Sequence, residues 1–106
     1  MTPRWHLPIA AVLALGLMSV SAHAATIQIS MENLVISPAE ATAKVGDTIE
    51  WINRDIFVHT ATARNGDWDV TMPPKKTVTL VLTKAGTIDY YCRFHPNMKA
   101  TLTVTP

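Results

Sequence analysis

Hydrophobic and polar residues alternate along most of the chain beyond residue 25. The alternation is clearest at 26–31 (Thr-Ile-Gln-Ile-Ser-Met), 48–53 and 76–83. A period of two sends successive side chains to opposite faces of a β-strand, so one face can be buried. No stretch beyond residue 25 has a helical period over three turns. We expect strands at residues 26–31, 33–38, 41–45, 48–53, 56–62, 76–83, 87–92 and 99–104.

Turn signals separate these segments at short intervals. Gly46-Asp47, Asn65-Gly66-Asp67 and Ala85-Gly86 are combinations that favour tight turns. Seven or eight short strands joined by such turns indicate a β-sandwich or a small barrel. The side chains expected to face inward are Ile27, Ile29, Met31, Ile49, Trp51, Val78, Leu80 and Leu82.

The first 24 residues have the three parts of a secretory signal peptide. Arg4 supplies the positive charge, residues 9–18 form an apolar core, and Ala22-His23-Ala24 is an A-x-A cleavage site. A membrane anchor is the alternative, but the apolar run is shorter than the roughly 20 residues that span a bilayer. We therefore predict a signal peptide at 1–24 and one exported domain at 25–106, with no membrane span after cleavage.

Cleavage changes the composition that matters for function. Loss of Arg4 leaves eight Lys and Arg against eight Asp and Glu, a formal net charge of zero. A neutral domain has no strong field to attract nucleic acid or an anionic membrane. The only two histidines beyond residue 25 are His59 and His95. The single cysteine, Cys92, cannot form a disulfide within the chain, so an oxidising compartment requires it to be buried or bound to a metal.

One short segment between two predicted strands collects three potential metal ligands. Cys92, His95 and Met98 follow one another at steps of three residues. Thiolate and thioether favour Cu(I), while imidazole binds both copper oxidation states, and His59 is the candidate fourth ligand. We expect Cys92 to end one strand and Met98 to begin the next, with the five residues between them forming a loop.

Each of these residues alone has a common explanation that involves no copper. These explanations are less convincing when the residues are considered as a set. A lone buried Cys is usually a small hydrophobic residue, and Met98 alone is most often core filling. His59 alone would more often be structural than a ligand. Structural zinc sites have no use for a thioether, and calcium and magnesium prefer oxygen ligands. A metal-free β-domain remains the alternative to a copper site.

Residues 25–106 resemble the cupredoxins, the small blue-copper proteins. The Cys-x-x-His-x-x-Met spacing is similar to the amicyanin-type ligand loop, with Pro96 after the histidine, and the wider family includes pseudoazurin-like and plastocyanin-like proteins. Ser37-Pro38, residues 45–48 and Trp51 extend the resemblance. It implies a Greek-key β-sandwich that binds one mononuclear type 1 copper ion. The implied ligands are His59, Cys92 and His95 in the equatorial plane and Met98 on the axis.

The chain departs from the family pattern at two places. Thr60 follows the first histidine, where many cupredoxins have an Asn that ties its strand to the cysteine loop. A shorter hydroxyl is expected to make this bridge differently. Arg93-Phe94, between Cys92 and His95, is bulkier and more charged than the small residues often found there.

The resemblance implies a periplasmic carrier of single electrons. We expect a monomer without enzymatic activity that meets donor and acceptor proteins transiently. His95 is predicted to lie near the surface as the electron port, surrounded by Pro96, Phe94 and Met72. A periplasmic protein that binds and delivers copper with the same ligands is the alternative function. An enzyme is disfavoured because no histidine remains to build an open coordination site.

Overall fold

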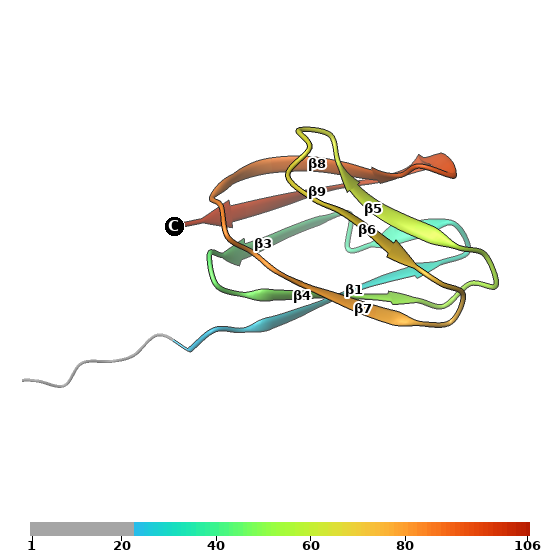
Figure 1. The fold of residues 1–106 in the computed structure, drawn as a ribbon, viewed down its shortest axis with the longest axis horizontal. Helices are drawn as coiled ribbons and strands as arrows, with labels where there is room; N and C mark the ends of the chain where they lie inside the picture. Colours follow the sequence, from blue (N-terminus) through green and yellow to red (C-terminus); the bar gives the residue numbers. More distant parts are fainter. Residues whose placement is uncertain (1–22) are drawn as a thin grey trace, which may run out of the picture.

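The computed structural model describes residues 23–106, so the predicted signal peptide lies outside the described residues except for its last two positions. Within the described part the chain forms nine strands and no helix (Figure 1). The strands are β1 (Thr26–Glu32), β2 (Val35–Ser37), β3 (Glu40–Lys44), β4 (Thr48–Asn53), β5 (His59–Ala63), β6 (Asp69–Met72), β7 (Thr77–Val81), β8 (Gly86–Cys92) and β9 (His95–Thr105).

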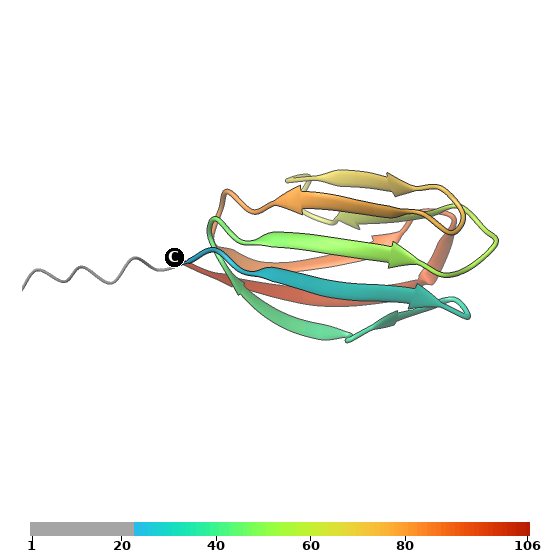
Figure 2. The same ribbon diagram turned by 90° about the horizontal axis from the view of Figure 1, so that it is seen from below.

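The strands form two sheets that face each other. One has the order β2-β1-β4-β7 and the other β3-β9-β8-β5-β6. Figure 1 shows the two layers roughly edge-on, and Figure 2 shows β1, β4 and β7 side by side in front of the other sheet. The chain crosses repeatedly between the sheets, which makes β1 parallel to β4 and β3 parallel to β9. The other paired strands are antiparallel. The predicted all-β sandwich with Greek-key crossovers is confirmed.

The short edge strand β6 was not among the predicted strands. It covers only four residues, between Trp68 and Pro73, which is too short for an alternating pattern to be distinctive. Its partner β5 defines it, with Met72 opposite His59. β6 therefore places an apolar residue directly beside a candidate ligand.

The inward faces of the two sheets meet in a core that matches the alternation in the sequence. Ile29 of β1 lies opposite Trp51 of β4 in a parallel register, and both are fully buried. Trp51 packs against Trp68 and Tyr90 at ring-centroid distances of 5.3 and 5.8 Å. The predicted inward positions are buried or partly buried: Ile27, Ile29, Met31, Ile49, Trp51, Val78, Leu80 and Leu82.

Two residues predicted in an extended segment instead form the turn of the β1–β2 hairpin. Asn33 and Leu34 have φ values of 54° and 63°. Two-residue hairpin turns favour positive φ at both positions because this backbone twist matches that of the flanking strands. Leu34 lines a pocket with His95 and Pro96, so the hairpin turn lies beside the candidate metal ligands.

The long strand β9 connects the two ends of the sandwich. It begins at His95, near the β8–β9 turn at the right of Figure 1, and ends at Thr105, near the C-terminus at the left. Val45, before Asp47 in the β3–β4 turn, donates its amide to the carbonyl of Thr105 at 2.8 Å.

In residues 23–106 no helix has the length and apolar character needed to cross a membrane.

Candidate metal centre

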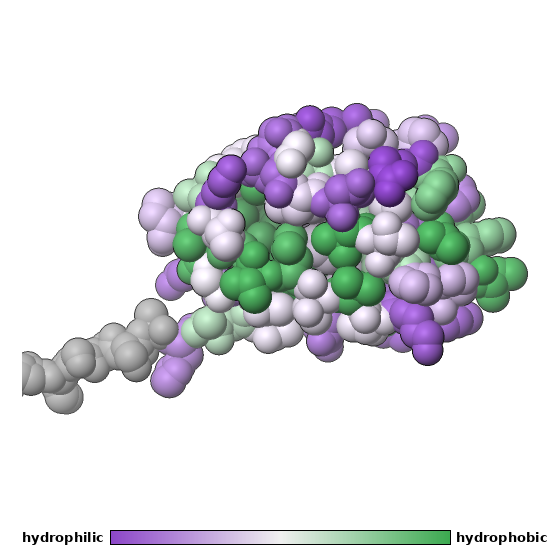
Figure 3. Space-filling view, viewed as in Figure 1, coloured by the Kyte–Doolittle hydropathy of each residue, from purple (hydrophilic) through white to green (hydrophobic). Residues whose placement is uncertain are grey.

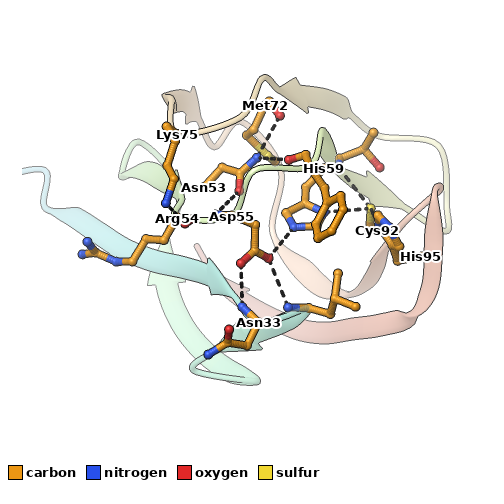
Figure 4. Close-up of polar contacts among 12 residues, drawn as sticks. Asn33, Asn53, Arg54, Asp55, His59, Met72, Lys75, Cys92 and His95 are labelled. Atoms are coloured by element: carbon orange, nitrogen blue, oxygen red, sulfur yellow. Dashed lines mark hydrogen bonds and ion pairs between the residues drawn. The ribbon is translucent and has the colours of Figure 1, made fainter.

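Three donor side chains from different strands meet at one end of the sandwich. His59 begins β5, Cys92 ends β8 and His95 begins β9. One potential ligand atom from each lies within 4.8 Å of those from the other two. The Cys92 Sγ atom is 3.7 Å from His59 Nδ1 and 3.7 Å from His95 Nδ1. Figure 4 shows the three side chains converging on one small volume.

The connection between Cys92 and the next strand is shorter than the sequence predicted. β9 begins at His95 and not near residue 99, so only Arg93 and Phe94 separate the two strands. Cys92 pairs with His95 across the ladder, with an irregular register between Tyr91 and Cys92. The prediction of a five-residue loop is wrong, because backbone pairing continues through two of the predicted ligand positions. A two-residue turn restricts movement of both donors more than a longer loop would.

Met98 lies three residues further along β9 and is 2% exposed. It lines a pocket of about 190 Å³ together with Leu34, His95, Pro96 and Asn97. Its thioether is therefore on the buried side of β9, next to the segment that carries His95. The axial-ligand role of Met98 stays a prediction.

Thr60 connects the strand of His59 to the turn after Cys92. Its backbone N–H donates to Cys92 Sγ at 3.4 Å, and its Oγ1 accepts the Arg93 N–H at 2.9 Å. Thr60 thus makes the bridge expected of the residue after the first histidine, with a hydroxyl in place of an amide. A backbone N–H directed at the sulfur stabilises a thiolate, since it adds a hydrogen bond to the negative charge.

The Thr60 hydroxyl continues into a short chain of hydrogen bonds that returns to Arg93. Thr62 Oγ1 donates to Asp69 Oδ1 at 2.7 Å, and Arg93 Nε donates to the same oxygen at 3.2 Å. Because Thr62 donates its proton to the carboxylate, it accepts the one from Thr60 at 2.9 Å. The bond from Thr62 holds the pKa of Asp69 below its usual value, and Arg93 lowers it further against the effect of partial burial.

His59 is fully buried, and its outward ring nitrogen has a carboxylate partner. Asp55 Oδ2 lies 2.7 Å from His59 Nε2. The same carboxylate accepts the N–H of Asn33 on Oδ1 at 2.7 Å and the N–H of Leu34 on Oδ2 at 3.1 Å. Burial raises the pKa of Asp55, but the hydrogen bond from His59 and those from Leu34 and Asn33 together lower it below the usual value.

An ionised carboxylate can only accept hydrogen bonds, and this determines the form of the His59 ring. Nε2 must carry the proton that Asp55 accepts. In a neutral imidazole Nδ1 then has a free lone pair, and Nδ1 is the atom that faces Cys92 Sγ. Asp55 was not among the site residues predicted from the sequence. The available signal was a carboxylate four residues before a candidate ligand.

Asn53 holds the loop that carries Asp55. It is 1% exposed, and its Oδ1 accepts the Asp55 N–H at 2.9 Å. Its Nδ2 lies 2.7 Å from the carbonyl oxygen of Phe57, and 3.2 Å from those of Met72 and Pro73. One buried amide therefore joins the end of β4, the loop before His59 and the end of β6 (Figure 4).

His95 is partly exposed, in contrast to His59 and Cys92. The Phe57 ring packs edge-on against it at a centroid distance of 5.8 Å. Large apolar side chains are exposed around this end of the sandwich, and hydrophobic atoms gather at the right of Figure 3. The exposed fractions are 72% for Ile56, 49% for Phe57, 39% for Val58, 54% for Phe94, 43% for Leu34 and 57% for Val35.

Met72 is not part of this exposed surface, contrary to the sequence prediction. It is 0% exposed and belongs to the hydrophobic core. Its position opposite His59 at the end of β6 directs it inward. The apolar surroundings of His95 include Phe57 of the loop before β5, in ring contact, together with Leu34 and Pro96, which line one pocket with it.

The donor set limits the metals that this site could hold. Two imidazole nitrogens and one thiolate sulfur in close reach, with a thioether nearby, form the His₂Cys arrangement with a weak axial ligand that is typical of blue-copper centres. Hard cations such as Ca²⁺ and Mg²⁺ prefer oxygen ligands. The nearest carboxylate, Asp55, is turned to the far side of the His59 ring, where it bonds Nε2.

Comparison with known proteins agrees with this geometry. Residues 6–104 match the cupredoxin-like domain family. Amicyanin from Paracoccus denitrificans is 38% identical over 71 residues, which are 61% of this chain and 54% of that protein. Amicyanin from Paracoccus versutus is 24% identical over 82 residues, 72% of this chain and 62% of that protein. The chain thus spans less than two thirds of the length of these curated relatives.

Solved structures show the same architecture. A reduced amicyanin variant superposes with a TM-score of 0.64 at 32% identity, covering 74% of this chain and 81% of that one. A reduced Cu(I) form of another amicyanin variant, at pH 4, has a TM-score of 0.64 at 31% identity, covering 80% and 85%. The crystal structure of Paracoccus versutus amicyanin gives 0.65 at 26% identity, covering 80% and 84%. With its family match, two-sheet fold and His-Cys-His cluster, this chain belongs to the cupredoxin-like family.

Proposed function

We propose that this protein is a type 1 copper protein that carries single electrons between redox partners. The observation that carries the proposal is the convergence of His59, Cys92 and His95 at one end of a rigid sandwich. We assign His59 Nδ1, Cys92 Sγ and His95 Nδ1 as the equatorial ligands and Met98 as the axial one. Copper is the cofactor that this donor set and the family membership support.

The protein's part in electron transfer is to hold the donors in one arrangement. Alternation of a bound copper ion between Cu(I) and Cu(II) is the one-electron chemistry that the cofactor supplies. His59 and Cys92 are fully buried, and Thr60 ties their strands together. The Asn53 and Asp55 bonds keep the loop before His59 in place. A site that needs little rearrangement between oxidation states transfers electrons quickly.

The partly exposed His95 is the electron port in this proposal. Its ring contacts Phe57, and the exposed apolar side chains of this end surround it. Apolar surface of this kind suits brief contact with a partner protein, because water is displaced without strong directional bonds that would slow release. The protein meets its donor and acceptor proteins in turn, as a monomer.

We also propose export, with the signal peptide at 1–24 removed and residues 25–106 folding in the periplasm. The single buried Cys92 suits an oxidising compartment only if burial or a metal protects it. The proposed site supplies both. The proposal is for a carrier and not an enzyme, since residues 25–106 contain no histidine beyond the two assigned ligands.

A Cu(II) titration tests this function. The wild-type protein should become intensely coloured at one copper per chain, from thiolate-to-copper charge transfer, and Cys92→Ser should abolish the colour. An uncoloured wild type, or colour that survives in the Cys92→Ser variant, contradicts the proposal.

Repeated redox cycling separates an electron carrier from a copper-delivery protein. A carrier should keep its copper through many cycles of chemical reduction and oxidation in the presence of a Cu(I) chelator. Loss of copper to the chelator in the first reduced cycle would favour the delivery function instead.

A further inference from the structure

Asp55 is the one side chain in the described structure that joins a proposed copper ligand to a different part of the fold through three hydrogen bonds. Two bonds come from the backbone of the β1–β2 turn, at Asn33 and Leu34. The third comes from His59 Nε2 at 2.7 Å. In Figure 4 the carboxylate lies between the turn and the imidazole.

The surroundings of Asp55 make it an acceptor and nothing else. Two of its partners are backbone N–H groups, and the pKa of its carboxyl is held below the usual value. An ionised carboxylate can only accept, so His59 Nε2 is the donor in the third contact. The carboxylate is 8% exposed as a residue, and the His59 side chain is 0% exposed. Hydrogen bonds between a charged acceptor and buried donors are shorter and stronger than neutral ones, which agrees with the two distances of 2.7 Å.

We infer that Asp55 is a positioning residue that sets the tautomer and donor strength of His59 and holds it in register with the β1–β2 turn. A carboxylate on the far nitrogen of a metal-bound imidazole fixes its orientation and makes the near nitrogen a stronger base. A stronger base and a nearby negative charge stabilise Cu(II) more than Cu(I). Asp55 should therefore lower the reduction potential of the site. This inference rests on the proposed function.

The chain contains a matched control for this role at the opposite end of the sandwich. Asp47 is 6% exposed, and its two oxygens accept the N–H groups of Ala25 and Lys44, each at 2.8 Å. Like Asp55 it ties a turn to a neighbouring segment, but its two side-chain bonds come only from backbone amides. Asp47→Asn removes one such carboxylate without touching the proposed metal site.

The experiment compares Asp55→Asn with Asp47→Asn, both expressed from the full sequence. Removal of a partner of a metal-bound histidine typically weakens metal binding ten- to a hundredfold. We expect Asp55→Asn to weaken Cu(II) binding about tenfold more than Cu(I) binding, which corresponds to a rise in reduction potential of about 59 mV. Asp47→Asn should leave the potential unchanged. Asp55→Glu, which keeps the charge, should give a potential closer to that of the wild type.

A measurement on the copper-free protein tests the same inference without electron transfer. Long-range ¹H–¹⁵N correlation spectra identify the protonated nitrogen of each imidazole. In the wild type we expect the proton of His59 on Nε2 with Nδ1 bare, and in Asp55→Asn a mixture of tautomers. Asp47→Asn should retain the wild-type pattern.

The outcomes distinguish failure of the inference about Asp55 from failure of the proposed copper function. If Asp55→Asn only lowers stability, with potential and tautomer as in the wild type, Asp55 merely fastens the turn and the inference is wrong. Equal shifts in potential for Asp55→Asn and Asp47→Asn would also overturn it. Should the wild type give no blue band at all, the proposed function fails, and the tautomer in the copper-free protein still decides the role of Asp55.

Discussion

The two ends of the sandwich share one arrangement of hydrogen bonds around an aspartate, but only one end uses it in the proposed metal site. At each end a buried aspartate accepts two backbone N–H groups, at least one of them from a segment distant in the sequence. Asp47 takes those of Ala25 and Lys44, and Asp55 takes those of Asn33 and Leu34. The pKa of each carboxyl is held below its usual value. Only Asp55 has a third partner, the imidazole of His59.

This difference shows how a structural feature can become part of a metal site. The bonds of Asp47 end in backbone groups, so its effect is confined to stability. Asp55 also bonds the His59 imidazole, whose other nitrogen lies 3.7 Å from Cys92 Sγ. Asp55 therefore restricts the position of a proposed ligand. The β1–β2 turn, the loop before β5 and the thiolate are thereby connected at one end of the molecule. Four predictions test this contrast between the ends.

The largest effect should follow from Cys92→Ser. In the wild type, copper at a thousand times its dissociation constant should add about 4.1 kcal/mol to the free energy of unfolding, because only the folded chain presents all ligands. The variant should lose most of this copper-dependent gain together with the blue colour. Thermal unfolding with and without Cu(II) measures it. Equal copper stabilisation of wild type and variant would exclude Cys92 as a ligand.

The next effect concerns the bridge at Thr60. Thr60→Val keeps the shape of the side chain but leaves the Arg93 N–H without its acceptor. This N–H is partly buried, so the loss of its acceptor should cost at most the roughly 1–3 kcal/mol of a fully buried unpaired donor. Thr60→Ser is the control, since it keeps the hydroxyl that accepts the Arg93 N–H. Denaturant unfolding of the copper-free proteins should rank Thr60→Val below Thr60→Ser, and the reverse order would contradict the bridging role.

Acid should weaken both ends, and Asp47→Asn should isolate one of them. The backbone bonds from Ala25 and Lys44 lower the folded-state pKa of Asp47. Its contribution is therefore complete above the unfolded-state pKa of roughly 3.9 and is lost as the pH falls through the lower folded-state value. The copper-free wild type should lose stability below about pH 4.

Asp47→Asn should have a shallower pH dependence in that range than the wild type. A remaining slope is expected, because the pKa values of Asp55 and Asp69 are lowered too. Unfolding free energies measured from neutral pH to about pH 3 provide the test. Identical slopes for both proteins would show that Asp47 does not titrate differently on folding.

The smallest effect concerns the start of the processed chain. Cleavage after Ala24 would turn the Ala25 N–H, which donates to Asp47 Oδ1 at 2.8 Å, into an α-ammonium group. A charged donor strengthens this bond, so a chain that begins at Ala25 should be slightly more stable than one with a short N-terminal extension. Asp47→Asn should abolish the difference. Mass spectrometry of the exported protein checks the cleavage site independently.

The sequence alone determined the fold class and the set of donor side chains. Alternation with period two is a local property, so the β-sandwich and its inward positions, such as Ile29 and Trp51, could be predicted without tertiary contacts. The same holds for the Cys-x-x-His-x-x-Met spacing, whose residue types restrict the chemistry to a few metals.

Tertiary structure decided how those donors are held. The Asp55 bonds join residues 21 and 22 positions apart, and the Thr60 bond to Arg93 spans 33 positions. Such partners depend on strand register and on which turns share an end, neither of which is encoded in a local pattern. For the same reason Met72, predicted at the surface, is buried opposite His59. The residue types specified what can bind, and the packing of the two sheets specified the geometry that binds it.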